Sequence, residues 1–159
     1  MVNFVKMREQ EFTDYLEFLI TDYSQDYAKI KEMCIEEARS QTELQIEALL
    51  PNGYATPDVF IGYIRYRDQN IGHIWYIHEH KKQYTFLADI EIFPDHRNRG
   101  YGTQALKLLE KEVDNLGFKA VILHVFKHNI PAKRLYEKLG YTVIQEIDTG
   151  FNMVKRLNQ

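Results

Sequence analysis

The stretch that decides the fold is Tyr84–Leu116, which reads YTFLADIEIFPDHRNRGYGTQALKLLEKEVDNL. Its first part is rich in aromatic and β-branched side chains, which favour a strand, and Pro94 ends that strand because it cannot donate to a sheet ladder. A helical pattern follows, and Gly117 supplies a typical helix stop. Its apolar positions recur at steps of three and four residues: Leu106, Leu109, Val113 and Leu116. The stretch therefore predicts a strand, a turn and an amphipathic helix.

The turn between these two elements is Arg97–Gly102, with the sequence RNRGYG. The start of a helix leaves about four backbone N–H groups without intrahelical partners and carries a partial positive charge. Gly100 and Gly102 have no Cβ, so the backbone can approach a ligand closely, and the two arginines add fixed positive charge. These features predict a phosphate-binding turn at a helix N-terminus, while an ordinary turn with solvated arginines remains the alternative.

Neither of the two common nucleotide-binding loops fits this turn. A P-loop requires Lys-Ser or Lys-Thr after the glycines, and the dinucleotide fingerprint requires a third glycine where this chain has Ala105. The pattern R-x-x-G-x-G after a strand that ends in proline instead resembles the acetyl-CoA loop of the GNAT family, the Gcn5-related N-acetyltransferases.

A second motif lies in His124–Tyr141, HVFKHNIPAKRLYEKLGY. In the GNAT family, the strand after the CoA-binding helix is commonly followed by N-x-x-A-x-x-L-Y-x-x-x-G-F. The matching residues here are Asn129, Ala132, Leu135, Tyr136 and Gly140, with Tyr141 in place of the usual Phe. The two motifs occur together in the family's order, and the resemblance is specific over Asp89–Gly140.

The rest of the chain shows further strand and helix patterns. Strands are predicted at Val2–Met7, Val59–Arg67, Ile71–His78, Lys119–Phe126, Tyr141–Ile147 and Phe151–Leu157, and helices at Glu9–Ile30, Glu32–Leu50 and Pro131–Leu139. Asp68–Asn70 is predicted as a turn, and Ser40–Thr42 weakens the second helix, where a break remains open. The resulting order, β-α-α-β-β-β-α-β-α-β-β, is similar to that of the GNAT fold.

The expected fold class is therefore α/β (α+β): a mixed, mostly antiparallel central sheet of about seven strands with helices on both faces. The length of 159 residues fits one domain, residues 1–159.

Composition and charge narrow the classes of partner. A net charge of −3 and a pI near 6.1 argue against general nucleic-acid binding. Cys34 is the only cysteine, so no internal disulfide can form, which favours a reducing compartment. No apolar run reaches the roughly 18 residues of a membrane span, and the N-terminus lacks the apolar core of a signal peptide. We therefore expect a cytoplasmic protein without nucleic-acid or membrane partners, and a homodimer remains open.

The resemblance to GNAT enzymes implies acetyl-CoA as cosubstrate and a set of residues that bind it. Backbone N–H groups of Asn98–Gly102 would hold the pyrophosphate, and the strand edge at Ile90 and Ile92 would pair with the pantetheine arm where two strands of the fold splay apart. Asn129 would bond the same arm. The full implied set is Ile90, Ile92, Arg97, Asn98, Arg99, Gly100, Tyr101, Gly102, Thr103, Asn129, Ala132 and Tyr136.

The same resemblance implies direct attack of a primary amine on the thioester, with Tyr136 as general acid. The general base is less clear. Some family members carry a Glu or His at positions that match Phe86 and Ala88, neither of which can accept a proton.

Three side chains could replace that base. Asp89 and Glu91 share one strand face by period-two alternation, and two close carboxylates would raise one pKa. His124 matches a position where ribosomal-protein N-terminal acetyltransferases carry a Glu, and its ordinary pKa near 6.5 suits a base. A water relay without a single base is a further alternative.

Other functions remain open from the sequence. One is a non-catalytic acyl-CoA-binding sensor of the same fold, and another is a nucleotide-binding module. The acceptor is also open among polyamines, aminoglycosides, peptide N-termini, Lys side chains and small metabolites. A zinc site at His73, His78 and His80 is not expected, because this spacing lacks the usual ligand pattern.

Overall fold

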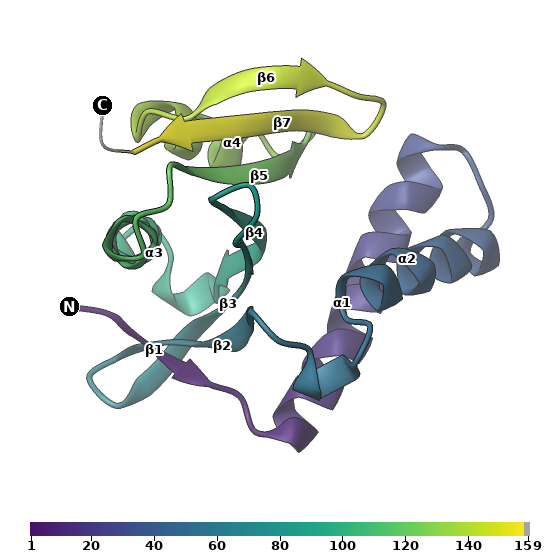
Figure 1. The fold of residues 1–159 in the computed structure, drawn as a ribbon. Coiled ribbons are helices and arrows are strands. Elements are labelled where there is room, and N and C mark those ends of the chain that lie inside the picture. The colour runs from purple at the N-terminus through teal and green to yellow at the C-terminus, as the bar shows by residue number, and fades with distance from the viewer. Residues whose placement is uncertain (158–159) are drawn as a thin grey trace. The chain divides into compact units, whose positions relative to one another are not determined.

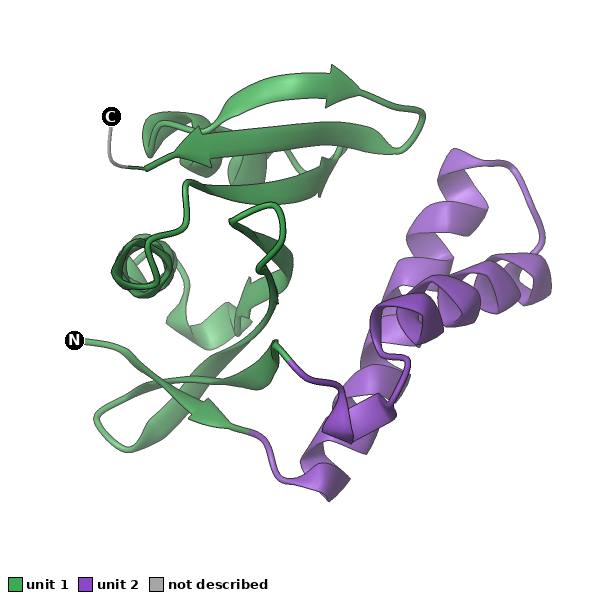
Figure 2. Cartoon of the chain, viewed as in Figure 1, with its two compact units in different colours: residues 1–6, 58–159 green, residues 7–57 purple. Residues whose placement is uncertain are grey.

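The computed structural model describes residues 1–157. The chain divides into two compact units (Figure 2): residues 7–57 form one, and residues 1–6 join the segment from residue 58 onward in the other. The predicted single domain over residues 1–159 stays a prediction, and its last two residues lie outside the described part of the chain.

The unit of residues 7–57 is built from helices α1, Glu9–Ile30, and α2, Ile35–Leu49, followed by the 3₁₀ turn η1, Gly53–Ala55 (Figure 1). The two long helices are joined by ion pairs, since the Arg39 guanidinium contacts Glu17 of α1 at 2.8 Å. The predicted start of α2 is wrong, because Glu32 has a left-handed backbone with φ 52°. The helix also continues through Ser40–Thr42. Buried Thr42 keeps its hydroxyl satisfied by donating to the carbonyl of Ala38 at 2.8 Å.

The other unit carries a seven-stranded sheet in the spatial order β1-β2-β3-β4-β5-β7-β6. Its strands are β1 Asn3–Lys6, β2 Val59–Tyr66, β3 Gln69–Glu79, β4 Tyr84–Ile92, β5 Ala120–Phe126, β6 Thr142–Glu146 and β7 Gly150–Arg156. Neighbouring strands pair antiparallel except β4 and β5, which are parallel. This mixed sheet and the order of its elements along the chain confirm the predicted fold class.

The β2–β3 hairpin is tighter than predicted. Its turn is Arg67-Asp68, and both residues have positive φ, 50° and 63°, as the two-residue turns of twisted hairpins require. The turn predicted at Asp68–Asn70 is therefore correct for Asp68 and wrong for Gln69 and Asn70, which belong to β3.

Helices α3, Tyr101–Asn115, and α4, Ile130–Lys138, share one face of this sheet, with the 3₁₀ turn η2, Pro94–His96, before α3 (Figure 1). Alternate residues of β5 point into the core on this face, and the apolar stripe of α3 packs there. Leu116 does not join that stripe and is 48% exposed, because α3 ends at Asn115 and Gly117 turns the chain with φ 77°. The expectation of helices on both faces stays a prediction, since the helices of this unit lie on one face.

Strands β4 and β5 separate part-way along their length. Their parallel ladder runs from Tyr84 and Ala120 to Leu87 and Leu123, and β4 continues beyond its last pair to Ile92. A bulge lies at the same place, because Tyr76 and Trp75 of β3 pair with Leu87 and Asp89 of β4, which leaves Ala88 as the extra residue. The expected divergence of these two strands is therefore present.

Among the described residues, no helix combines the length and the apolar character needed to cross a membrane.

Candidate active site

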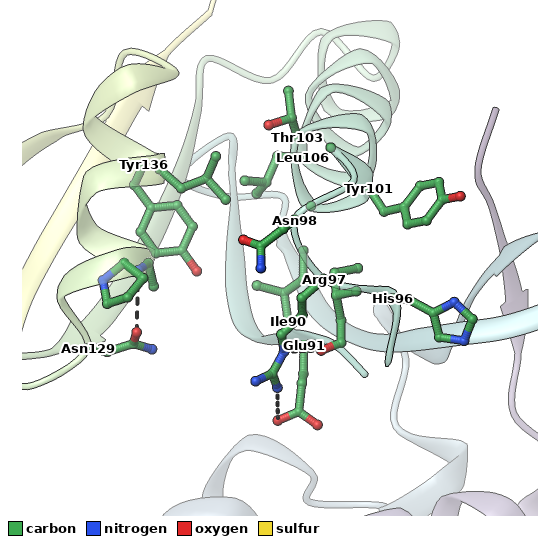
Figure 3. Close-up of a pocket in the computed structure, with 16 residues that line it drawn as sticks. Ile90, Glu91, His96, Arg97, Asn98, Tyr101, Thr103, Leu106, Asn129 and Tyr136 are labelled. Carbon is green, nitrogen blue, oxygen red and sulfur yellow. Dashed lines mark hydrogen bonds and ion pairs between the residues drawn. The ribbon is translucent and has the colours of Figure 1, made fainter. Parts of the chain in front are cut away.

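A pocket of about 630 Å³ lies where β4, the N-terminus of α3 and helix α4 meet (Figure 3). Its lining residues are Ile90, Glu91, Ile92, His96, Arg97, Asn98, Gly100, Tyr101, Gly102, Thr103, Leu106, Asn129, Pro131, Ala132, Leu135 and Tyr136. The volume is in the range of small-molecule and cofactor sites. The two sequence motifs, although more than twenty residues apart, thus line a single cavity.

One end of the pocket is polar and is formed by the turn before α3. Asn98 and Gly100 both have left-handed backbones, with φ 62° and 82°, and alternation of this kind turns successive N–H groups toward a common centre. Gly100 is the N-cap of α3 and no side chain caps the helix there. The first intrahelical bond runs from the Gln104 N–H to the Gly100 carbonyl. The end of the helix can therefore direct N–H groups at an anion.

Arg97 is held in place beside this turn. Its Nε donates to the carbonyl of Ile92 at 2.7 Å, and its Nη2 lies 3.9 Å from Oε2 of Glu91 (Figure 3). This bonding orients the guanidinium and keeps its charge at the polar end of the pocket. Arg99, which the resemblance also implied, is exposed and is not among the lining residues.

The other end of the pocket is apolar. A Cβ added to Gly102 would lie 3.4 Å from Leu135 and 3.9 Å from Ile92, so any longer side chain there would extend into this narrow part of the cavity. Leu106 and Ala132 complete the wall. A polar end and an apolar end in one cavity suit a ligand with an anionic head and a long, mostly uncharged arm.

Asn129 begins α4 and caps it. Its Oδ1 accepts a hydrogen bond from the Ala132 N–H at 3.3 Å, and Pro131 occupies the first turn, where a missing N–H costs nothing (Figure 3). The cap uses the amide oxygen alone, so the side-chain NH₂ can still donate to a ligand. Asn129 can therefore cap α4 and, as predicted, also bind the pantetheine arm.

Tyr136 projects from α4 with its hydroxyl directed into the pocket (Figure 3). The side chain is buried, and its ring packs against Tyr141 at 5.8 Å between centroids. Burial raises the pKa of the Tyr136 hydroxyl well above its ordinary value, and the negative charge of Asp89 raises that pKa further. The phenol is consequently protonated across the physiological range.

Asp89 and Glu91 lie on the sheet face opposite α3 and α4, because they pair with Trp75 and His73 rather than with the core-facing residues of β3. The predicted shared face is thus present, but each acid has a basic side chain of its own beside it. Oδ2 of Asp89 lies 3.0 Å from Nε2 of His73, while Glu91 lies beside Arg97. The side chain of Asp89 is 11% exposed and that of Glu91 is 31% exposed.

His124 lies on the same face as Asp89, across the separation of β4 and β5. It follows Leu123, the last β5 residue paired with β4, and it is not among the residues that line the pocket. Nε2 of His124 lies 3.0 Å from the Thr149 hydroxyl. Burial lowers the pKa of the imidazole below its ordinary value, so the neutral form predominates at neutral pH.

Some lining residues were not predicted as ligand contacts: His96, Leu106, Pro131 and Leu135. The helical period identified Leu106 only as an apolar position, and the second motif included Leu135 without a role. Periodicity marks the buried stripe of a helix but does not show which part of that stripe borders a cavity.

Comparison with known proteins identifies the family. A family model described as "Acetyltransferase (GNAT) family" matches residues 12–141. The chain belongs to the GNAT acetyltransferase family. It is 32% identical over 146 residues to the uncharacterized N-acetyltransferase YycN of Bacillus subtilis (strain 168), covering 89% of this chain and 91% of YycN.

Solved structures of GNAT proteins have the same fold. The crystal structure of the putative acetyltransferase YycN from Bacillus subtilis superposes with a TM-score of 0.85 at 27% identity, covering 92% of this chain and 96% of YycN. The PaiA N-acetyltransferase from Thermoplasma acidophilum, solved in complex with coenzyme A, superposes with a TM-score of 0.67 at 19% identity, covering 98% of this chain and 99% of that one.

Membership of the GNAT family confirms the activity class and the cosubstrate. The protein is an acetyl-CoA-dependent acyltransferase, as its motifs indicated. The roles of individual residues, the acceptor, a homodimer and a cytoplasmic location stay predictions.

Proposed function

We propose that this GNAT protein transfers the acetyl group of acetyl-CoA to a primary amine by direct attack. The backbone of Asn98–Thr103 and the Arg97 guanidinium bind the pyrophosphate, the β4 edge at Ile90 and Ile92 together with Asn129 binds the pantetheine arm, and Tyr136 acts as general acid. Arg99 contributes long-range charge near the phosphates rather than a direct contact, since it is exposed.

The single observation that carries this proposal is the shape of the pocket. It begins at the uncapped N-terminus of α3 and passes along β4 to the Tyr136 hydroxyl, near the point where β4 and β5 separate. An anionic head at the helix N-terminus would lie in the favourable field of the helix dipole. The thioester would then lie beside Tyr136, within reach of groups on the opposite face of the sheet.

The reaction balances with one base and one acid. The amine nitrogen forms a bond to the thioester carbon and loses a proton to the base. The carbon–sulfur bond breaks, and its electron pair leaves with sulfur, which takes a proton from Tyr136. The base then releases its proton to solvent, and Tyr136 regains one. Asp89, Glu91 and His124 are the candidate bases, because all three lie on one face of the sheet beyond the last pair of the β4–β5 ladder.

Binding of acetyl-CoA is tested at Gly100. We expect a Kd in the micromolar range, about −8 kcal/mol. Gly100→Asp adds a carboxylate at the anion-binding helix end, and we expect it to abolish binding in calorimetry. Gly100→Asn has almost the same shape without the charge and, because Asn tolerates φ 82°, should retain much of the affinity.

A control at the other end of α3 separates charge from backbone strain. Gly117 also has a left-handed backbone, with φ 77°, and a Cβ added there would meet no neighbouring group within 4 Å. Gly117→Asp should therefore cost similar stability but leave CoA binding intact. Undiminished CoA binding by a folded Gly100→Asp variant would show that the phosphates bind elsewhere.

Transfer is tested with a panel of amines: spermidine, kanamycin, tyramine and the tripeptide Lys-Ala-Ala. Release of CoA, together with the acetylated amine in mass spectrometry, should occur with at least one of them. Absence of transfer to every amine, with intact CoA binding, would favour the non-catalytic sensor instead.

A further inference from the structure

His73 is a buried histidine on β3 that the reaction proposed above does not use. It is 5% exposed, pairs across the ladder with Glu91, and its ring meets the edge of Phe93 at 5.7 Å between centroids. Its Nε2 lies 3.0 Å from Oδ2 of Asp89. The two atoms are at ion-pair distance, although the ring orientation does not meet the angular requirement of a hydrogen bond.

So short a distance between two buried acceptors requires a proton. An imidazole lone pair and a carboxylate oxygen repel each other at 3.0 Å where little water screens them. Both side chains are largely buried, at 6% and 11% exposure. Burial on both sides therefore keeps Oδ2 of Asp89 against Nε2 of His73.

Asp89 occupies a favourable position for contact with the reacting atoms. It is the first residue after the β4 bulge, beyond the end of the ladder with β5, and its neighbour Ile90 lines the pocket. Its charge also reaches Tyr136, because it raises the pKa of that hydroxyl. Asp89 and Tyr136 thus lie near enough to interact electrostatically, although they are on opposite faces of the sheet.

Glu91 lines the pocket and Asp89 does not, but Glu91 and His124 each have other contacts. Glu91 lies two residues further from the end of the ladder, is more exposed, and lies beside Arg97. His124 lies at the end of the ladder, but its Nε2 is in contact with the Thr149 hydroxyl. Glu91 lies beside a guanidinium and His124 beside a hydroxyl, whereas Asp89 lies against an imidazole.

We propose that His73 is a positioning residue for Asp89, and that Asp89 is the base which accepts the amine proton. By holding Oδ2, His73 fixes the rotation of the carboxylate on which proton transfer to the second oxygen depends. The imidazole also lies beside the carboxylate before it accepts the amine proton, so that the partly buried acid has a polar neighbour. The inference rests on the proposed transfer to an amine.

Two amide substitutions at His73 test the contact. The amide nitrogen of Gln reaches nearly as far as Nε2, whereas that of Asn stops near the position of Nδ1. We expect His73→Gln to keep most of kcat with the fastest amine of the panel. His73→Asn should lower kcat by about 10–100-fold, because a misplacement of about 1 Å has effects of this size. The KM for acetyl-CoA should be unchanged in both variants.

The Asp89→Asn background makes the test specific. In that background the two His73 variants should have the same kcat, because the group that His73 positions is gone. If His73 has only a structural role, the difference in kcat between His73→Gln and His73→Asn should persist in the Asp89→Asn background. His78→Asn is the matched control, since His78 lies on the same strand, faces the opposite side and contacts Thr85; its kcat should equal that of the parent.

A second measurement needs neither turnover nor a variant at His73. Nitrogen-15 NMR of the intact protein should show a proton on Nε2 of His73 at about pH 7, and Asp89→Asn should shift that signal. If Nε2 of His73 carries no proton and its signal is unchanged by Asp89→Asn, the proposed contact is wrong.

The outcomes separate this inference from the proposed function. If no amine of the panel is acetylated by the parent, the proposed transfer fails, and the inference fails with it. If the parent transfers acetyl groups while His73→Gln and His73→Asn have equal kcat, or while Asp89→Asn is unimpaired, only the inference is overturned.

Discussion

At the scale of single residues, burial determines what Tyr136 can do. A free phenol and a thiol differ little enough in basicity for proton exchange, but the surroundings of Tyr136 hold its proton more tightly. A thiolate that forms in the same apolar cavity is destabilised too, which raises the pKa of the leaving thiol. Burial thus raises the pKa of both the phenol and the leaving thiol, so the phenol remains a suitable proton donor.

We therefore expect Tyr136→Phe to lower kcat by about 10²–10⁴ while the Kd of CoA changes little, because only the hydroxyl is removed. The pH–rate profile between about pH 6 and 9 should show no step from Tyr136 in the parent, since its raised pKa lies above this window. Stopped-flow kinetics with a saturating amine would measure the chemical step.

The control for this prediction is Tyr66→Phe, which removes a hydroxyl on β2 outside the pocket lining. Turnover of Tyr136→Phe within about twofold of the parent, with chemistry rate-limiting, would make Tyr136 a packing residue.

At the scale of elements, a buried polar network joins α3 to β7 and to the start of β6. The carboxylate of Glu110 on α3 accepts hydrogen bonds from the Tyr141 hydroxyl at 2.9 Å and from Lys155 of β7 at 2.7 Å. Glu110 is 9% exposed and would be costly to bury without these donors. The network explains why Tyr141 stands where the family motif usually has Phe.

We expect Tyr141→Phe to lower the free energy of unfolding by about 1.5–3 kcal/mol, because it removes a hydrogen bond to a buried charged group. Urea unfolding followed by circular dichroism would measure the loss. In a Glu110→Gln background the same substitution should cost clearly less, since the bond is then to a neutral group. An equal cost in both backgrounds would assign the effect to packing of the ring.

At the scale of the whole molecule, CoA binding can show whether the two compact units unfold together or separately. The proposed CoA site lies in the unit that contains the sheet, so CoA binding should stabilise that unit directly. At a concentration of about 100 times Kd, the stabilisation is about 2.7 kcal/mol. For a chain of this length, that corresponds to a rise in Tm of about 5–10 °C.

We expect calorimetry to show one transition that moves as a whole with CoA, as the predicted single domain requires. Two transitions, of which only one moves, would mean that residues 7–57 unfold independently. The Gly100→Asp variant serves as the control, since its transition should not respond to CoA.

The sequence determined most of the elements, because their signals are local. No tertiary contact was needed to predict α3 from its apolar period, or its limits from Pro94 and Gly117. The two motifs were likewise identified from the sequence alone. The failures were local as well. The Arg67-Asp68 turn lacks the usual Asn-Gly. The break left open at Ser40–Thr42 is absent, because the Thr42 hydroxyl donates to the Ala38 carbonyl within a continuous α2.

The tertiary structure alone decided which face of the sheet Asp89 lies on and which side chain it contacts. Leu87 faces the core, so strict alternation would turn the side chain of Asp89 to the same apolar face beneath α3. The extra residue at the bulge, Ala88, exchanges the two faces for the rest of β4 as far as Ile92. The same bulge places Ile90 and Ile92 along the pocket and Asp89 against His73. A bulge depends on the pairing of β4 with its neighbours, and a contact between β3 and β4 depends on their register. Neither is encoded in a local period, so the sequence could name the acids but not their partners.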